Sequence, residues 1–370
     1  MPRSVIVADA LPPAPGPYSY AVQAGGWVFT AGLSGFDRTG AIAGASSGPV
    51  EAGAQTRQAL DNLATALAAV GVPLAHVAKV KGYLTDFGHA AAYNAAYRDT
   101  FAAPWPARAT AGAALVGEDA VVALEAIASV AGPPQVIHPA GRADPPVPLS
   151  QGMQAAGVLL ASGQLARDAS GVLIGRGDLA AQAGQALDNL GTVLAAAGLG
   201  FADVVKINTT VSSWRARPRY DETFARRFAE PFPAHAIVRG APGVDGMLIE
   251  IEAVAVRGPR RVVRSALAPA CHAVQVGNLV HLAGGALESL RRCLQDLDGR
   301  LEDVVKTNVT LADHRLLPAF DAEYGAFFRP PYPARTTVVA GLPGKGTLVA
   351  IEAVAVLGAA EESIAITGAG

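Results

Sequence analysis

The sequence is poor in charged residues and in cysteine. Only 16% of its 370 residues are Asp, Glu, Lys or Arg, and the formal net charge is −2. A chain without a surplus of positive charge is a poor electrostatic match for a phosphate backbone, so we expect no nucleic-acid partner. The two cysteines, Cys271 and Cys293, are too few for a disulfide scaffold or a Cys-rich zinc site.

Long apolar runs are also missing. No stretch approaches the roughly 18 uninterrupted apolar residues of a membrane span, and the first residues carry no run typical of a signal peptide. We therefore expect a cytoplasmic protein with no membrane partner. Apolar residues nevertheless make up 51% of the chain. This proportion excludes disorder for most of the length and is enough to build several cores.

The chain contains three copies of one pattern. The segments VAKVKGYLTD, VVKINTTVSS and VVKTNVTLAD begin at residues 77, 204 and 304. Lys79, Lys206 and Lys306 mark their common register, and we interpret these lysines as solvated. The same offsets align further aromatic, proline and strand motifs, which indicates three homologous domains. We place them at 1–131 (unit one), 132–258 (unit two) and 259–358 (unit three), followed by a tail over 359–370.

Each unit shows the same order of periodic segments. In unit one, Leu60, Leu63 and Leu67 form a helical stripe, and Gly71 stands where a helix commonly ends. The order β-β-α-β-α-β-β predicts an α+β fold with both helices on one face of a sheet. The other face must be covered, so we expect the copies to cover one another as an intramolecular pseudo-trimer that is a monomer in solution.

Unit three is shorter than the others. Gly32 and Leu63 are 31 residues apart in unit one, whereas the matching Gly284 and Leu290 are 6 residues apart in unit three. A hairpin and loop are therefore missing from this copy, and the three units are not equivalent.

The motifs of unit one resemble those of a known family. They are PGPYSYAVQAGGWVFTAG from residue 15, QALDNL from 58, YNAAY from 93, PARAT from 106 and LEAIA from 124. Together they closely resemble the RidA family, also called the YjgF family, whose core is similar to that of chorismate mutase. The resemblance implies small domains that form trimers, with ligand clefts between subunits. It also implies hydrolysis of imines and enamines of 2-amino acids, without a metal or an organic cofactor.

The resemblance assigns candidate site residues. The family arginine of the PAR motif matches Arg108 and Arg335, and a guanidinium can hold a ligand carboxylate through two parallel hydrogen bonds. The family glutamate matches only Glu250, and a carboxylate near an imine carbon can activate water. Three further positions line the ligand pocket in the family, and in unit one they match Tyr18, Gly32 and Asn94.

The set is incomplete in every unit. Ala123 replaces the glutamate in unit one, His235 replaces the arginine in unit two, and Ala350 replaces the glutamate in unit three. The resemblance places the arginine and the glutamate in one subunit. On that basis we expect hydrolysis of simple 2-imino acids to be weak, with unit one supplying most of the site through Tyr18, Asn94 and Arg108.

Two replacements allow alternative interpretations. Glu125, Glu252 and Glu352 persist in all three units, either as structural groups near the pseudo-axis or, for Glu125 or Glu352, as a displaced catalytic base. His235 either binds an anion or acts as a base, because histidine titrates near neutrality, or it is a tolerated polar residue in an inactive cleft.

Three functions remain open at this stage. The first is an enzyme acting on a small carboxylate-bearing imine, enamine or related metabolite. The second is a non-catalytic protein that binds such a metabolite. The third is an enzyme of the chorismate-converting type on a similar core. The endoribonuclease activity sometimes assigned to the family finds no support in the net charge.

Overall fold

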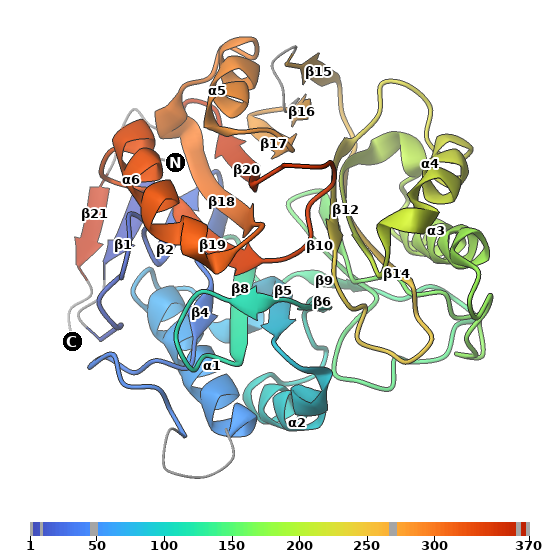
Figure 1. Ribbon diagram of the computed structural model, residues 1–370, viewed down its shortest axis with the longest axis horizontal. Helices are drawn as coiled ribbons and strands as arrows, with labels where there is room; N and C mark the ends of the chain where they lie inside the picture. Colours follow the sequence, from blue (N-terminus) through green and yellow to red (C-terminus); the bar gives the residue numbers. More distant parts are fainter. Residues whose placement is uncertain (1–2, 8–9, 45–50, 266–271, 360–363, 368–370) are drawn as a thin grey trace.

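The computed structural model describes residues 3–7, 10–44, 51–265, 272–359 and 364–367. It contains three sheets, each with two α-helices packed on one face. The units surround a common centre with their helices on the outside (Figure 1). Ala270, which takes the place of Tyr18 in unit three, and its neighbour Cys271 lie outside the described residues.

Every unit follows the predicted order β-β-α-β-α-β-β. Unit one contains β2 (Ala21–Ala24), β3 (Trp27–Thr30), α1 (Ala52–Ala68), β5 (Val77–Leu84), α2 (Ala90–Thr100), β6 (Ala107–Gly112) and β8 (Val122–Ser129). Unit two contains β10 (Gly152–Ala155), β11 (Val158–Ala161), α3 (Leu179–Ala196), β12 (Val204–Val211), α4 (Arg217–Ala225), β13 (Ala234–Arg239) and β14 (Ile249–Val256). Unit three contains β16 (His272–Val276), β17 (Leu279–Ala283), α5 (Leu287–Gln295), β18 (Val304–Leu311), α6 (Leu317–Phe328), β19 (Ala334–Val339) and β20 (Val349–Val356).

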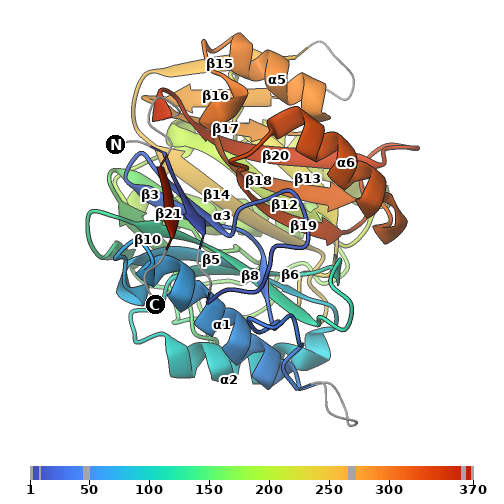
Figure 2. The same ribbon diagram turned by 90° about the vertical axis from the view of Figure 1, so that its left-hand side faces the viewer.

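Short strands extend these sheets. They are β1 (Ser4–Val7), β4 (Leu33–Ser34), β7 (Ala114–Leu115), β9 (Gln135–Ile137), β15 (Arg260–Arg264) and β21 (Ile364–Thr367). The tail supplies β21, which pairs in parallel with β1, so these two strands lie side by side (Figure 1), and β21 faces the viewer in Figure 2. The described part of the tail thus belongs to the sheet of unit one.

The helices form where the apolar stripes predicted them. In α1 the stripe residues Leu60, Leu63 and Leu67 are fully buried against the sheet. The helix stops before Gly71, whose φ of +67° is a left-handed conformation that favours glycine. In unit three α5 has 9 residues, against 17 in α1, so the deletion removes part of this helix and not only the hairpin and loop expected from the sequence.

The face of each sheet opposite its helices is covered by the other units. Trp27 and Phe29 of unit one share one apolar cluster with Met153 and Leu160 of unit two and Val305 of unit three. A single unit would expose these side chains to water, and burying them together stabilises the assembly. The prediction of an intramolecular pseudo-trimer is confirmed by this arrangement.

The edge of each sheet meets the first segment of the next unit. The edge strand of unit one is β6. It pairs in parallel with β5, and α2 forms the crossover that a parallel pair requires. Ala107 of β6 bridges to Ser150 of unit two, and Ala334 of unit three bridges to Ser19 of unit one in the same way. We call these junctions the one–two cleft and the three–one cleft, and the equivalent junction of units two and three the two–three cleft.

Candidate functional site

Strand register decides which residues can share a cleft. Arg108 lies opposite Val80 on β5, whereas Ala123 lies opposite Tyr83, three residues further along the same strand. Side chains alternate between the two faces of a sheet, so an odd separation places the arginine and glutamate positions of one unit on opposite faces. The expectation that both come from one unit is therefore wrong: a pair in one cleft must come from neighbouring units.

In the one–two cleft the backbone of Arg108 and the carboxyl of Glu250 meet at the same residue, Gly163. The backbone N–H of Gly163 donates to the Arg108 carbonyl at 3.0 Å. The Glu250 carboxyl lies directly on Gly163, because a Cβ there would sit 1.7 Å from Glu250 Oε1. Ser162 Oγ accepts from the Arg108 N–H at 2.8 Å and donates to the Ser150 carbonyl. This position must be glycine for the carboxyl of unit two to reach the edge strand of unit one.

Arg108 is a buried cation without a counter-ion in the described part of the chain. Its side chain packs on the rings of Tyr93 and Tyr97, with Cζ 5.2 and 4.9 Å from the ring centroids. The residue is 4% exposed, and its Nε and Nη1 have no hydrogen-bond partner. Aromatic faces attract a cation but leave its N–H donors unused. A buried guanidinium in this state is suited to a ligand carboxylate.

Glu250 has a proton affinity suited to catalysis. Burial, followed by repulsion from Glu252, raises the pKa of Glu250 to about 8, although Lys79, Lys81 and the Thr110 amide act in the opposite direction. A carboxyl whose pKa lies near the working pH can both take and return a proton efficiently. Such shifts are common at active sites, where burial and like charges are arranged around a reacting group.

The three–one cleft holds a different combination. It encloses a cavity of about 420 Å³ lined by Tyr18, Gly32, Ala123, Asp321 and Arg335, among others. Arg335 Nη2 is 2.7 Å from Asp321 Oδ1, so this guanidinium already has a counter-ion. Ala123 supplies no acid here. The cleft has an aromatic wall and a neutralised arginine, without a catalytic carboxyl at the family position.

The predicted group Tyr18, Asn94 and Arg108 is not brought together. The Tyr18 ring lies 5.2 Å from the Arg335 guanidinium, in the three–one cleft. The sequence aligns Leu149 with this tyrosine in the one–two cleft. Asn94 lies on α2 beside Tyr93, and its buried Oδ1 has no hydrogen-bond partner. Asn94 aligns with Asp321. The position that carries a carboxylate beside Arg335 in unit three therefore carries an uncharged amide in unit one.

His235 is held as a neutral side chain in the two–three cleft. Its Nε2 lies 3.0 Å from both Thr209 Oγ1 and Tyr220 Oη, and its ring stacks on Phe224. Burial, with a smaller contribution from Lys206, lowers the pKa of His235 to about 3. The expectation of titration near neutrality therefore fails, because protonation would place an unpaired charge among buried rings.

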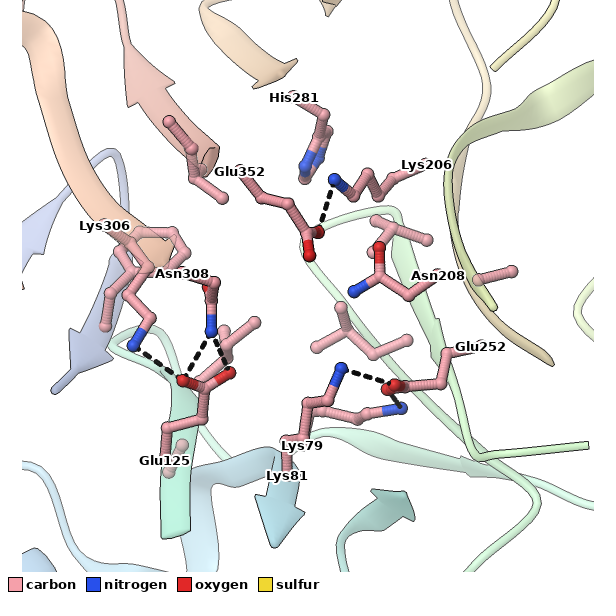
Figure 3. A pocket seen from close by; sticks show the side chains of 18 residues that line it. Lys79, Lys81, Glu125, Lys206, Asn208, Glu252, His281, Lys306, Asn308 and Glu352 are labelled. Atoms are coloured by element: carbon pink, nitrogen blue, oxygen red, sulfur yellow. Dashed lines mark hydrogen bonds and ion pairs between the residues drawn. The ribbon is translucent and has the colours of Figure 1, made fainter. Parts of the chain in front are cut away.

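Glu125 lies at the pseudo-axis and not in a cleft (Figure 3). Its carboxylate accepts from Lys306 at 2.8 Å and from Asn308 at 2.7 Å. Burial opposes ionisation, but Lys306 and Lys81 outweigh it and lower the pKa of Glu125. The structural interpretation of this residue fits, and the displaced-base interpretation does not. The expectation that Lys79, Lys206 and Lys306 are solvated is also wrong, since they are 8%, 7% and 6% exposed.

Comparison with known proteins identifies the family. The model of the family described as Endoribonuclease L-PSP matches the chain three times, over residues 9–130, 141–257 and 274–357. The chain therefore belongs to this family, which includes the RidA and RutC proteins, and carries three of its domains in one polypeptide.

Individual relatives each match about one unit. A RutC family protein of Pyrococcus horikoshii is 36% identical over 127 residues, which are 34% of this chain and 97% of that protein. A 2-iminobutanoate/2-iminopropanoate deaminase of Dermatophagoides farinae is 34% identical over 127 residues, which are 34% of this chain and 95% of that protein. The crystal structure of RidA from a Psychrobacter species is 29% identical, covers 33% of this chain and 99% of its own, and superposes with a TM-score of 0.31.

Two further features are missing from the described residues, namely a metal-binding cluster and a membrane-spanning helix. No group of three or more His, Cys, Asp or Glu side chains there could hold a metal ion. No helix in the same part of the chain is long and apolar enough to cross a membrane.

Proposed function

We propose that this protein hydrolyses a small 2-imino acid to the corresponding 2-oxo acid and ammonia, and that the one–two cleft is its active site. One observation carries the proposal: Arg108, whose buried guanidinium has unpaired N–H groups, and the carboxyl of Glu250 both adjoin Gly163 at the junction of units one and two. The other two clefts lack both a free arginine and the glutamate: the three–one cleft has a neutralised Arg335 and Ala123, and the two–three cleft has His235 and Ala350. Relatives named as 2-iminobutanoate/2-iminopropanoate deaminases support this class of reaction.

The residues of the cleft have distinct tasks in this reaction. Arg108 holds the substrate carboxylate through paired N–H donors, and the unpartnered Asn94 amide lies on the helix beside it. Glu250 takes a proton from water as the oxygen attacks the imine carbon, which gives a carbinolamine. Glu250 passes this proton to the imine nitrogen and so completes the carbinolamine. As the C–N bond breaks, Glu250 takes the hydroxyl proton and passes it to the leaving nitrogen, so that the carbonyl forms and ammonia leaves. Water supplies the carbonyl oxygen, and the carboxyl ends the cycle in its original state.

The direct test is an assay of the purified full chain with freshly generated 2-iminobutanoate. Loss of the imine is followed with a carbonyl-reactive trap, and the uncatalysed rate is subtracted. We expect clear acceleration that saturates with substrate. A correctly folded protein that leaves the uncatalysed rate unchanged would contradict the proposal.

The three–one cleft supports a second, non-catalytic role. Its cavity has the volume for a metabolite, but Ala123 takes the place of the glutamate. A ligand bound there would not be hydrolysed by the mechanism above. The alternative of a metabolite-binding protein thus applies to one cleft of the molecule, beside a catalytic one.

The contrast between Asn94 and Asp321 gives a testable exchange. In Asp321→Asn, Arg335 loses its counter-ion, so we expect its affinity for pyruvate to rise at least about tenfold. In Asn94→Asp, the new carboxylate neutralises Arg108, and carboxylate binding in the one–two cleft falls by a similar factor. Isothermal titration calorimetry measures both. An unchanged binding isotherm in Asp321→Asn would show that this ion pair does not control the cleft.

A further inference from the structure

A second cavity lies at the pseudo-threefold axis, apart from the three clefts. It has a volume of about 100 Å³. Side chains from all three units converge on it (Figure 3). Its polar lining consists of lysines, glutamates and amides together with one histidine: Lys79, Lys81, Lys206, Lys306, Glu125, Glu252, Glu352, Asn208, Asn308 and His281.

Three of the lysines form a symmetric ring of ion pairs. Lys79 binds Glu252 of unit two at 2.9 Å, Lys206 binds Glu352 of unit three at 2.6 Å, and Lys306 binds Glu125 of unit one at 2.8 Å. Each unit thereby gives one ammonium to the next unit and receives one from the previous unit. These six groups balance one another, and they hold the units together.

Lys81 breaks this balance. The aligned residues of units two and three are Asn208 and Asn308, so only unit one carries a second lysine. Lys81 binds Glu252 at 2.8 Å, and this carboxylate is already paired with Lys79. The cavity is therefore lined by four ammonium groups and three carboxylates. An ammonium has three N–H donors. Among the described residues, Lys81 pairs with the Glu252 carboxylate, which leaves donors of Lys81 available to a ligand.

Two other polar side chains of the cavity lack partners. His281 aligns with Phe29 and Leu160, so a polar residue has replaced an apolar one in unit three alone. It is 7% exposed, and its Nε2 has no hydrogen-bond partner. Asn208 Oδ1 is also unpartnered, whereas the equivalent Asn308 donates to Glu125. Buried polar groups without partners are costly, which suggests that a ligand satisfies them.

Apart from the three glutamates that line the cavity, Glu250 is the acidic residue that could neutralise Lys81. It points from β14 on the same face as Glu252, two residues away. Burial and the repulsion of Glu252 raise the pKa of Glu250 to about 8, so it is mostly protonated at neutral pH. The surplus positive charge of the cavity then remains uncompensated by the described side chains.

We propose that the axial cavity binds one small monovalent anion, of the class of chloride. Lys81 supplies the opposite charge and the His281 imidazole supplies a neutral N–H donor. The unpartnered Asn208 Oδ1 is an acceptor, and it binds a water that accompanies the anion. The volume is sufficient for an ion with a few waters, since a single water needs only about 10–15 Å³ on this measure. The site lies between all three units, so an anion bound there stabilises their assembly.

The chain offers matched control variants. Lys81→Asn introduces the residue that units two and three already carry, and His281→Leu introduces the residue of unit two. Both changes therefore fit the local fold. We measure the melting temperature at pH 7 while chloride replaces gluconate at constant ionic strength. In the wild type we expect a saturable rise of at least about 1 °C, because a ligand that binds only the folded state stabilises it.

Lys81→Asn is expected to lose this chloride dependence, and His281→Leu to shift its midpoint to higher concentration. Chloride bound to the outer surface would act equally on all three proteins. Crystals soaked in bromide give a second readout, with an anomalous peak in the axial cavity of the wild type and none in Lys81→Asn. An identical chloride dependence in Lys81→Asn, or a wild-type cavity without bromide, would overturn the proposal. Neither readout depends on enzymatic activity.

Discussion

Replacing Glu250 by Gln is expected to lower kcat/KM for 2-iminobutanoate by about 10²–10⁴-fold, the usual contribution of a positioned acid or base. Gln keeps the size of the side chain and its place against Gly163, but it cannot accept a proton from water. The reaction is measured as for the wild type, with the uncatalysed rate subtracted.

The pH profile gives a sharper readout. The pKa of Glu250 is about 8, and the reaction begins with the ionised carboxylate. We expect the kcat/KM of the wild type to rise with pH up to a plateau above about pH 8, and Glu250→Gln to lose this limb. A profile with the same limb in both proteins would assign the titration to another group.

Loss of folding can be separated from loss of catalysis. A carboxyl whose pKa is raised in the folded state is ionised in the unfolded chain above about pH 4.5, so stability falls as the pH rises from there towards 8. Gln does not ionise. We therefore expect the melting temperature of Glu250→Gln at neutral pH to equal or exceed that of the wild type, while activity is lost.

The sequence was sufficient to predict the architecture. Repeated motifs in a fixed register predicted three units, and the leucine stripe of α1 predicted a helix buried on one side. These signals are local, because helix and strand periods depend on neighbouring residues. The covering of the sheets followed from composition, since an apolar face must be buried against something.

The site depended on contacts between units, and here the sequence-based interpretation went wrong. Arg108 and Ala123 are close in the chain, which suggested that they face each other. The register of β5 places them on opposite faces, and the carboxyl that reaches the edge strand of Arg108 comes from Glu250 in the next unit. A count of strand parity between these positions could have given this result. Which neighbour supplies the carboxyl could not be found without the packing of the units.

Other residues escaped notice because their roles depend on partners. In the sequence Lys81 is an ordinary lysine of a strand. The structure shows that it shares Glu252 with Lys79, so the axial cavity has one more ammonium group than carboxylates. Asp321 looks like a conservative replacement of asparagine, but it neutralises Arg335 across 2.7 Å. The alignment of the three units contained a signal for both residues. Lys81 and Asp321 are charged at positions where another unit has an asparagine.

The second large effect is expected from Arg108→Lys, with Arg335→Lys as its matched control. Lys keeps the positive charge but loses the planar pair of N–H donors that holds a carboxylate. Removing one partner of a buried, hydrogen-bonded charge pair costs about 2–5 kcal/mol, so we expect at least about a 30-fold loss of kcat/KM in Arg108→Lys. Much of this loss should appear as a higher KM. Arg335→Lys should change kcat/KM less than about threefold, because its cleft lacks a base.

This comparison distinguishes the two clefts that retain the arginine. The three–one cleft has the roomy cavity and the family tyrosine, whereas the one–two cleft has the unpaired guanidinium and the carboxyl of Glu250. If Arg335→Lys lost more activity than Arg108→Lys, the reaction would belong to the cavity and would need a base other than Glu250. If only Arg108→Lys lost activity, hydrolysis would take place in the one–two cleft, where unit one supplies an arginine and unit two supplies a glutamate.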